Sequence, residues 1–399
     1  MSSPTPERAV AILSIAAFAS SASLRCTDAL LPLLAAEFGT TPGGAAAVIT
    51  AFSIAYGLLQ VVHGPIGDKV GKYQLIFATS VISMFGTLAC AIAPSLELLV
   101  VARFAAGATV GAIIPLAIAW IGDVVPYDRR QSVLARFLIG QMTGVAAGSS
   151  LGGLLGEHFG WRSPFWFLAA FYAGVSLLLW IELRGNPATR TDPASAPSSI
   201  GGGFRRIAGL LPDPWVRTML LTAAIEGALV AGSMSFVALH LHQNLGAGLG
   251  ASGSALVAFA AGGLLYAAVS GRLVKRLGER GLALAGGFTI SAAFFGLLAA
   301  GSVAWALPCL LAVGAGLYML HNTLQVNATQ MAPNSRGAAV ALFALSLFSG
   351  QSFGVWVGGL VVDAVGTTPL FLATAIGLSL LALDFRRRLA RRATLTRPA

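Results

Sequence analysis

Residues 64–72 (GPIGDKVGK) occur a second time, in altered form, 207 positions later as residues 271–279 (GRLVKRLGE). Both copies have glycine at the first and eighth positions and a cation at the sixth, whereas the acid at the fifth position, Asp68, is replaced by a basic residue in the second copy. A second pattern, G-Q-x-x-G-x-x-x-G, begins at Gly140 and recurs at Gly350, 210 positions later. Two nearly equal offsets indicate that half of the chain was duplicated in the same orientation.

The composition is that of a membrane protein. Hydrophobic residues make up 56% of the 399 residues and charged ones 10%, and the mean hydropathy is +0.80, whereas a soluble domain carries about 25% charge. Stretches of about 20 apolar residues are long enough to cross the hydrocarbon core. We expect twelve such spans, at residues 9–34, 45–66, 74–93, 97–122, 132–156, 164–183, 215–240, 253–273, 282–301, 305–329, 338–361 and 369–385.

The expected fold is all-α, with twelve transmembrane helices in two pseudo-symmetric six-helix bundles. Residues 1–184 form the first bundle and residues 215–399 the second, which ends in a basic cytoplasmic tail. Residues 185–214, rich in Pro, Gly, Ser and Arg, are expected to form a cytoplasmic linker. Parallel halves in a hydrophobic chain are typical of transporters whose site lies between the halves.

The net charge of +10 indicates membrane topology rather than nucleic-acid binding. Most of the 25 Lys and Arg fall in segments that the twelve-span arrangement places on one side, and such an excess marks the cytoplasmic side. Both termini are therefore expected in the cytoplasm. The abundance of arginine, alanine and glycine is typical of a high-GC bacterial genome, which predicts a multi-pass protein, expected to be a monomer, in the bacterial cytoplasmic membrane.

Motifs for other chemistries are missing from the sequence. The three cysteines have no paired spacing, and there is no Walker loop, H-E-x-x-H or dinucleotide fingerprint. The G-x-S-x-G pattern at residues 350–354 lies in an apolar stretch, whereas a hydrolase needs it on a strand-to-helix turn. We expect no cofactor, no metal and no enzymatic activity, and a secondary transporter rather than an ATP-driven pump.

Residues 64–72 resemble the signature cytoplasmic loop between the second and third helices of the major facilitator superfamily. Residues 103–115 (RFAAGATVGAIIP) are similar to the fourth-helix motif of that family, and residues 123–130 (DVVPYDRR) to the loop that follows it. Residues 319–325 (MLHNTLQ) resemble bacterial sugar-efflux and drug/proton antiporter permeases. The resemblance implies the major facilitator fold and transport by alternating access.

A gating latch on the cytoplasmic side is implied by this resemblance. Gly64 and Gly71 permit a tight turn between helices, and Asp68 is a carboxylate suited to cap a helix or to pair with an arginine. In the family this carboxylate latches the two bundles together, with arginines of the following loop as partners. The residues expected to form the latch here are Gly64, Asp68, Lys69, Gly71, Lys72, Arg129 and Arg130.

Glycines recur at every fourth position from Gly140 to Gly156 in the fifth span. Such a face lets a neighbouring helix backbone approach closely, so we expect a structural role. Antiporters of the family carry a proline directly after the third of these glycines, where this chain has Ser149. This departure favours the alternative that the protein is not an antiporter.

Four charged residues, Arg25, Asp28, Arg103 and Glu226, fall inside the expected spans. A charge facing lipid at mid-bilayer costs about 2.5–3.5 kcal/mol on insertion scales, so we expect these side chains to face protein or a cavity. Asp28 and Arg103 lie at similar depth, which favours a salt bridge; a structural strut, a proton-sensitive pair and an anion site remain open. Arg25 is three residues from Asp28 on the same helix face, and two arginines with one aspartate suit an anionic substrate group.

Glu226 lies about eleven residues into the seventh span, near the midplane, with no cation nearby in the sequence. An unpaired carboxyl in a low-dielectric site can take up and release a proton, so we expect proton coupling at Glu226, Asp28 and His321, rather than a Glu226 that stays neutral. His321 is similar in depth and lies on a polar stripe of the tenth span. The residues expected to line the substrate cavity are Arg25, Arg103, Tyr56, Gln60, Gln141, Tyr318, Asn322, Gln325 and Gln351.

Together these features predict a secondary active transporter that uses protons to export a small organic compound. One alternative is an importer or facilitator of a small metabolite or organic anion held by Arg25 and Arg103. A second is a membrane sensor that resembles a transporter and moves nothing. The expected partners are the small-molecule substrate, protons and the lipid bilayer.

Overall fold

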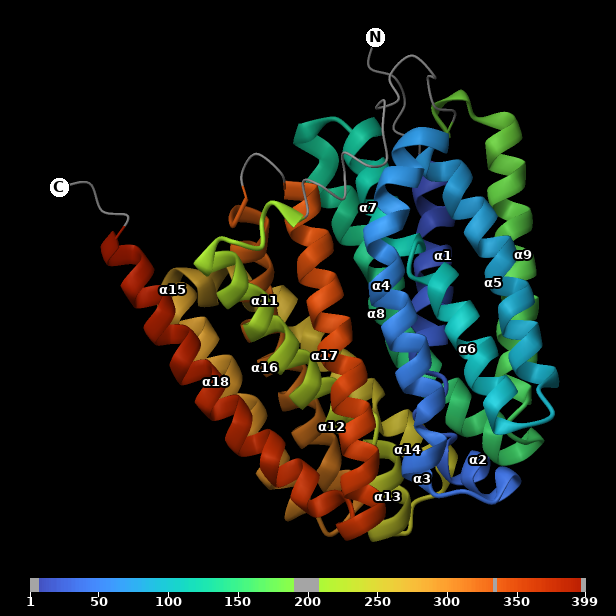
Figure 1. Cartoon of the computed structure of the whole chain (residues 1–399), viewed down its shortest axis with the longest axis vertical. Coiled ribbons are helices and arrows are strands. Elements are labelled where there is room, and N and C mark those ends of the chain that lie inside the picture. The colour runs from blue at the N-terminus through green and yellow to red at the C-terminus, as the bar shows by residue number, and fades with distance from the viewer. Residues whose placement is uncertain (1–6, 190–207, 333–335, 396–399) are drawn as a thin grey trace.

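The computed structural model describes residues 7–189, 208–332 and 336–395, and in these ranges all regular structure is helical (Figure 1). The predicted all-α fold is therefore confirmed for the described residues. The helices of the first half are α1 (Glu7–Arg25), α2 (Leu31–Phe38), α3 (Pro42–Ala45), α4 (Ala47–Val70), α5 (Lys72–Ile92), α6 (Leu96–Val110), α7 (Ile113–Val124), α8 (Tyr127–Phe159) and α9 (Ser163–Gly185), followed by a 3-10 turn (Pro187–Thr189).

The second half repeats this arrangement. Its helices are α11 (Pro214–Glu226), a π-helical turn (Gly227–Ala231), α12 (Gly232–Met234), α13 (Val237–Leu245), α14 (Leu249–Ala255), α15 (Val257–Leu298), α16 (Val303–Gln330), α17 (Arg336–Val365) and α18 (Thr367–Leu395). Most of the predicted linker, 185–214, lies outside the described residues.

Eleven helical segments in the described ranges are long and apolar enough to cross a membrane. One of them, Leu249–Leu298, has 50 residues, which at 1.5 Å per residue is more than twice the hydrocarbon thickness. It is interrupted at Gly278, whose φ of 61° is not helical. Gly262 and Gly286, on opposite sides of this interruption, both lie against α16. The segment therefore doubles back, which supports the prediction of twelve spans.

Several predicted spans are broken in ways that the hydropathy pattern does not reveal, and two of these breaks lie beside charged residues of the expected site. The first span is interrupted by turns at residues 26–30, between α1 and α2. The seventh changes from α-helix to a π-helical turn directly after Glu226. Such π-turns occur frequently at functional sites, because they re-aim the side chains beside them.

The glycine ladder has the predicted structural role in both halves. Gly140, Gly144, Gly148 and Gly152 of α8 lie so close to the backbone of α1 that a methyl group on any of them would clash with a carbonyl oxygen. Gly350 and Gly354 of α17 make the same approach to the backbone of the seventh span. The fifth helix of each half thus packs on the first helix of that half, as the duplication requires.

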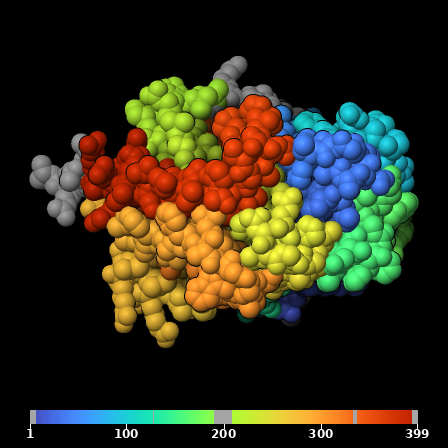
Figure 2. Space-filling view, turned by 90° about the horizontal axis from the view of Figure 1, so that it is seen from below, coloured from blue at the N-terminus to red at the C-terminus, as the bar shows by residue number. Residues whose placement is uncertain are grey.

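Hydrogen bonds between the two halves lie at the end opposite Glu7 and Leu395, which the sequence predicts to be the outer end, and further in, between α4 and the middle of α17. Those at the outer end join Asp363 to Thr41 and Gly43, and Glu157 to Gly250. Those in the middle join Gln351 to Ser53 and Ser352 to Thr50. Figure 2, which shows the end that the sequence predicts to lie outside, has the blue residues of the first half directly against the yellow and orange-red residues of the second.

Candidate functional site

A buried pair formed by Glu226 and His321 lies in the second half. The Oε2 atom of Glu226, the last residue of α11, is 2.9 Å from Nδ1 of His321 on α16. The Glu226 side chain is 1% exposed and that of His321 is 21% exposed. The expectation that Glu226 has no partner is therefore wrong, because the fold brings to it a histidine from 95 residues away.

The surroundings of this pair fix its position. Gly227, the first residue of the π-helical turn, is packed closely against the backbone of Leu347 on α17. The ring of His321 is 5.7 Å from that of Phe343, also on α17. The second carboxylate oxygen of Glu226, Oε1, is buried without a hydrogen-bond partner among the described residues. A buried acceptor of this kind is costly unless it gains a proton or a donor.

A second charged pair lies in the first half. The Arg25 guanidinium is 3.1 Å from the Asp28 carboxylate, and both side chains are largely buried. The two oxygens of Asp28 have no well-aligned hydrogen bond within the described ranges, so the contact is electrostatic rather than a directed hydrogen bond. The partner of Asp28 is thus its neighbour on the same segment, and the predicted salt bridge to Arg103 is wrong.

Arg103 is held by backbone carbonyls. Its guanidinium donates to the carbonyl oxygens of Ser23 at 3.1 Å and Val48 at 3.3 Å, and stacks 3.9 Å from the centre of the Phe52 ring. The residue is 2% exposed. Arg103 thus joins α6 to the first and second spans. This favours a structural strut over a proton-sensitive pair or an anion site. Its burial does not support the expected position on the cavity surface.

The other residues expected to line the cavity divide into two groups. Tyr56 and Gln351 are buried between the halves: the Tyr56 ring is 4.5 Å from that of Phe348, and Gln351 donates to the Ser53 hydroxyl at 2.9 Å. These two residues join the halves. Side chains that are half-buried or exposed are those of Gln60, Gln141, Tyr318, Asn322 and Gln325, and their place on a cavity stays a prediction.

The predicted latch is arranged differently from the family pattern. Asp68 is 2.9 Å from Lys72, and Lys72 is 2.7 Å from Asp123. In the described ranges Asp68 therefore pairs with Lys72, and the expectation that Arg129 and Arg130 are its partners is wrong for this conformation. Asp68 and Lys72 are four residues apart, a spacing that places two side chains side by side.

The glycines of the latch differ in their roles. Gly71 has φ 101°, a conformation that favours glycine, and forms the predicted turn between α4 and α5. Gly64 lies within α4, so the turn expected there is wrong. Lys69 is exposed. Arg130 donates to the carbonyl oxygen of Val125 at 3.3 Å.

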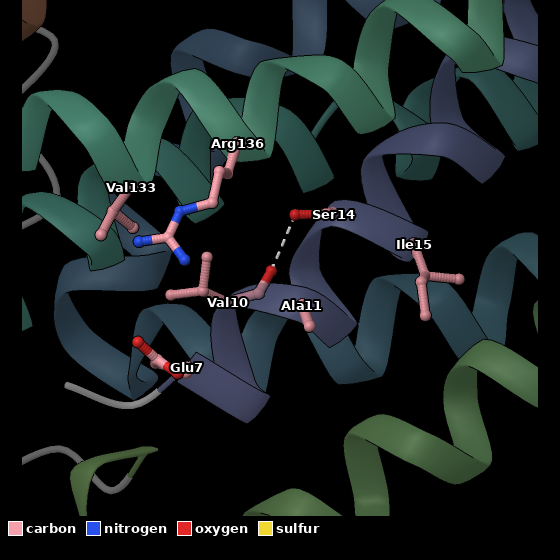
Figure 3. Close-up of a pocket in the computed structure, with 7 residues that line it drawn as sticks. All are labelled: Glu7, Val10, Ala11, Ser14, Ile15, Val133 and Arg136. Carbon is pink, nitrogen blue, oxygen red and sulfur yellow. Dashed lines mark hydrogen bonds between the residues drawn. The ribbon is translucent and has the colours of Figure 1, made fainter. Parts of the chain in front are cut away.

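A cavity of about 300 Å³ lies between the N-terminal parts of α1 and α8. Figure 3 shows Arg136 of α8 reaching across toward α1, with Glu7 at the start of that helix. The remaining lining residues are Val10, Ala11, Ser14, Ile15 and Val133. This cavity belongs to the first half alone, so it is not the predicted substrate cavity between the halves.

No group of three or more His, Cys, Asp or Glu residues able to hold a metal ion occurs within the described ranges. Cys26 and Cys90 are buried and Cys309 is partly buried, and all three are free thiols.

Helices of this length and hydropathy, arranged in two repeated halves, define a multi-pass membrane transporter. A family model described as Major Facilitator Superfamily matches residues 13–355, and the chain belongs to this family. A probable transporter of Streptomyces coelicolor is 29% identical over 372 residues, which covers 89% of this chain and 84% of that protein. A chloramphenicol resistance protein of Streptomyces lividans is 27% identical over 285 residues, 69% of each chain. The crystal structure of the nucleoside transporter NupG is similar in fold, with a TM-score of 0.77 and 15% identity over 95% of this chain and 98% of that one.

The sequence contained no direct signal for the polar contacts between the halves at Glu157 and Asp363. The sequence does relate their partner residues to each other, because Gly43 and Gly250 are 207 positions apart, which is the offset of the repeated loop.

Proposed function

We propose that the protein is a secondary transporter that exports a small organic compound in exchange for protons, by alternating access. The Glu226–His321 pair carries this proposal. It is a buried pair of two titratable groups, one of them a carboxylate with an oxygen that lacks a donor. Two titratable side chains in contact, one of them buried inside a membrane span, are typical of proton-transfer sites.

The chemistry of the pair suits an exchange of proton and substrate. With one shared proton the pair is neutral overall, as a protonated histidine beside a carboxylate; without it the pair carries one negative charge. A substrate that brings a positive charge or a hydrogen-bond donor to Oε1 of Glu226 replaces the proton electrostatically. Proton and substrate then compete for the same site, which is the requirement for antiport.

The contacts between the halves support access from the cytoplasm in this conformation. The halves are hydrogen-bonded at the outer end and in the middle, while Asp68 pairs within its own half. In the proposed cycle the outer contacts break, the cytoplasmic ends come together, and Asp68 exchanges Lys72 for a partner in the second half. The name of the chloramphenicol resistance relative supports export of an organic compound.

The alternative of an organic-anion importer has less support. Of its two proposed anion ligands, Arg25 is paired with Asp28 and Arg103 is buried against carbonyl oxygens. An anion would therefore have to displace Asp28 from Arg25. We further propose a monomer in the bacterial cytoplasmic membrane with both termini in the cytoplasm, as the distribution of Lys and Arg predicts.

The test is transport by the purified protein in proteoliposomes with an imposed pH gradient, across a panel of organic cations, neutral drugs such as chloramphenicol, and organic anions. We expect the gradient to drive substrate in the direction opposite to protons, and Glu226→Gln to remove this drive. Glu182→Gln is the matched control, because Glu182 is also buried but pairs with Arg8 at the cytoplasmic end. Full proton-driven transport by Glu226→Gln would refute the assignment, and gradient-driven uptake of anions alone would favour the importer.

A further inference from the structure

Asp363 of the second half holds the start of a helix in the first half. Its Oδ1 atom accepts a hydrogen bond from the backbone N–H of Gly43 at 2.8 Å, and its Oδ2 atom accepts one from the Thr41 hydroxyl at 2.6 Å. Thr41 is the N-cap of α3. The backbone N–H groups at a helix start lack intrahelical acceptors and carry partial positive charge, so a carboxylate binds well there.

Glu157 of the first half makes the corresponding contact in the opposite direction. Its Oε2 atom accepts a hydrogen bond from the backbone N–H of Gly250 at 2.7 Å. Gly250 is the second residue of α14, which begins the eighth span. Again a carboxylate of one half satisfies a free N–H group of the other.

The glycines of the two contacts are related by the duplication, whereas the two acids, 206 positions apart, lie one helical turn out of the 210-residue register of their helices. Gly43 and Gly250 are separated by 207 positions, the offset of the repeated cytoplasmic loop, and each is the second residue of its helix. Glu157 and Asp363 each lie two residues before the end of their helix, α8 and α17, the fifth helices of their halves. A side chain at either glycine would collide with the facing carboxylate. Two such contacts at the same end of the molecule are stronger evidence for a functional connection between the halves than a single surface ion pair would be.

We propose that Glu157 and Asp363 form the outer gate of the transporter, two equivalent carboxylate latches that stabilise the conformation closed to the outside. The inference rests on the alternating-access cycle proposed above. To open outward, the halves must separate at this end, and both sets of hydrogen bonds must break. The latches therefore stabilise only the outer-closed state, and interactions made in one state alone shift the equilibrium between the two.

The experiment measures the separation of the outer ends directly. Spin labels are attached to cysteines at Ala36 on α2 and Ala304 on α16, which are exposed residues at the outer ends of the two halves. The labels are placed in a background in which the three native cysteines are replaced by alanine. Distances between the labels, measured by electron–electron double resonance in lipid nanodiscs, give the ratio of outer-closed to outer-open molecules without any substrate.

We expect Asp363→Ala and Glu157→Ala each to raise the outer-open population by about three- to tenfold, and the double variant by about the product of the two. Asp363→Asn and Glu157→Gln, which keep an acceptor but lose the charge, should give smaller shifts. Glu97→Ala is the control, because Glu97 is an exposed acid at the same end, in the first turn of α6. Distance distributions that the alanine variants change no more than Glu97→Ala would overturn the gate.

Failure of the gate and failure of the proposed transport are distinguishable here. The distances are read without a proton gradient, so a shift in the alanine variants supports the gate even if the coupling assignment to Glu226 fails. The converse outcome is a wild type that exchanges protons for substrate in proteoliposomes while the variants show unchanged distances. That combination would support the transport proposal and refute the gate.

Discussion

Removing the charge of Glu226 and the ring of His321, singly and together, gives the sharpest prediction from this structure. Glu226→Gln keeps the shape and a hydrogen bond to His321 but cannot carry a proton. His321→Leu leaves Glu226 without the ring nitrogen that now lies 2.9 Å from it. Since Glu226 is 1% exposed, water cannot replace that partner without a rearrangement.

The magnitude follows from the contact. A hydrogen bond to a charged group contributes about 1.5–3 kcal/mol, and every 1.4 kcal/mol is about tenfold. His321→Leu should therefore lower proton-driven transport by about ten- to a hundredfold. Glu226→Gln should abolish it, and the double variant should be no worse than Glu226→Gln alone, because residues that act as a unit are not additive.

The assay compares two modes of transport in the same proteoliposomes. One is uptake driven by a pH gradient; the other is exchange of labelled for unlabelled substrate without a gradient, which needs no net proton movement. Glu226→Gln should lose the first and keep the second. Unchanged proton-driven transport in either single variant would refute the shared role of the pair, and equal loss of both modes in Glu226→Gln would contradict a role specific to the proton.

Other predictions concern stability. Arg103→Met should lower the thermal midpoint in detergent markedly, because two buried hydrogen bonds and a ring contact, together about 3–5 kcal/mol, are lost. Gly144→Val should reduce the folded yield, whereas Gly174→Val, which meets open space, should not. The Arg162 guanidinium holds the pKa of Glu37 below its usual 4.5, so the contribution of this pair is present above that pH and is lost as the pH falls. The wild type should therefore have a higher thermal midpoint than Glu37→Gln at pH 7, and this difference in midpoint should vanish toward pH 3.

Sequence reasoning succeeded where the signal was periodic or repeated. The apolar stretches, the duplication and the glycine ladder each follow from spacing alone, and the ladder of α8 lies against α1 as its period requires. Gly71 was predictable because a turn between two helices needs a residue that tolerates positive φ. Most of the predicted linker lies outside the described residues, so the division into two bundles and a linker remains a prediction.

The incorrect predictions at the site concern which side chains pair with one another. The pairs Arg25–Asp28 and Asp68–Lys72 have helical spacings of three and four residues and were available from local rules, but depth matching and family resemblance favoured more distant arginines. The histidine beside Glu226 could not be assigned from spacing. Its distance depends on how α11 and α16 pack and on the π-helical turn, neither of which hydropathy records.

Proton release on substrate binding is the most direct test of the central claim that substrate and proton compete at the Glu226–His321 pair. The purified protein in detergent, in weakly buffered solution with a pH-sensitive dye, is mixed with a substrate found in the liposome screen. The account predicts release of up to one proton per protein in the wild type and none in Glu226→Gln. Substrate that binds the wild type without releasing a proton at any pH between about 5 and 9 would contradict it.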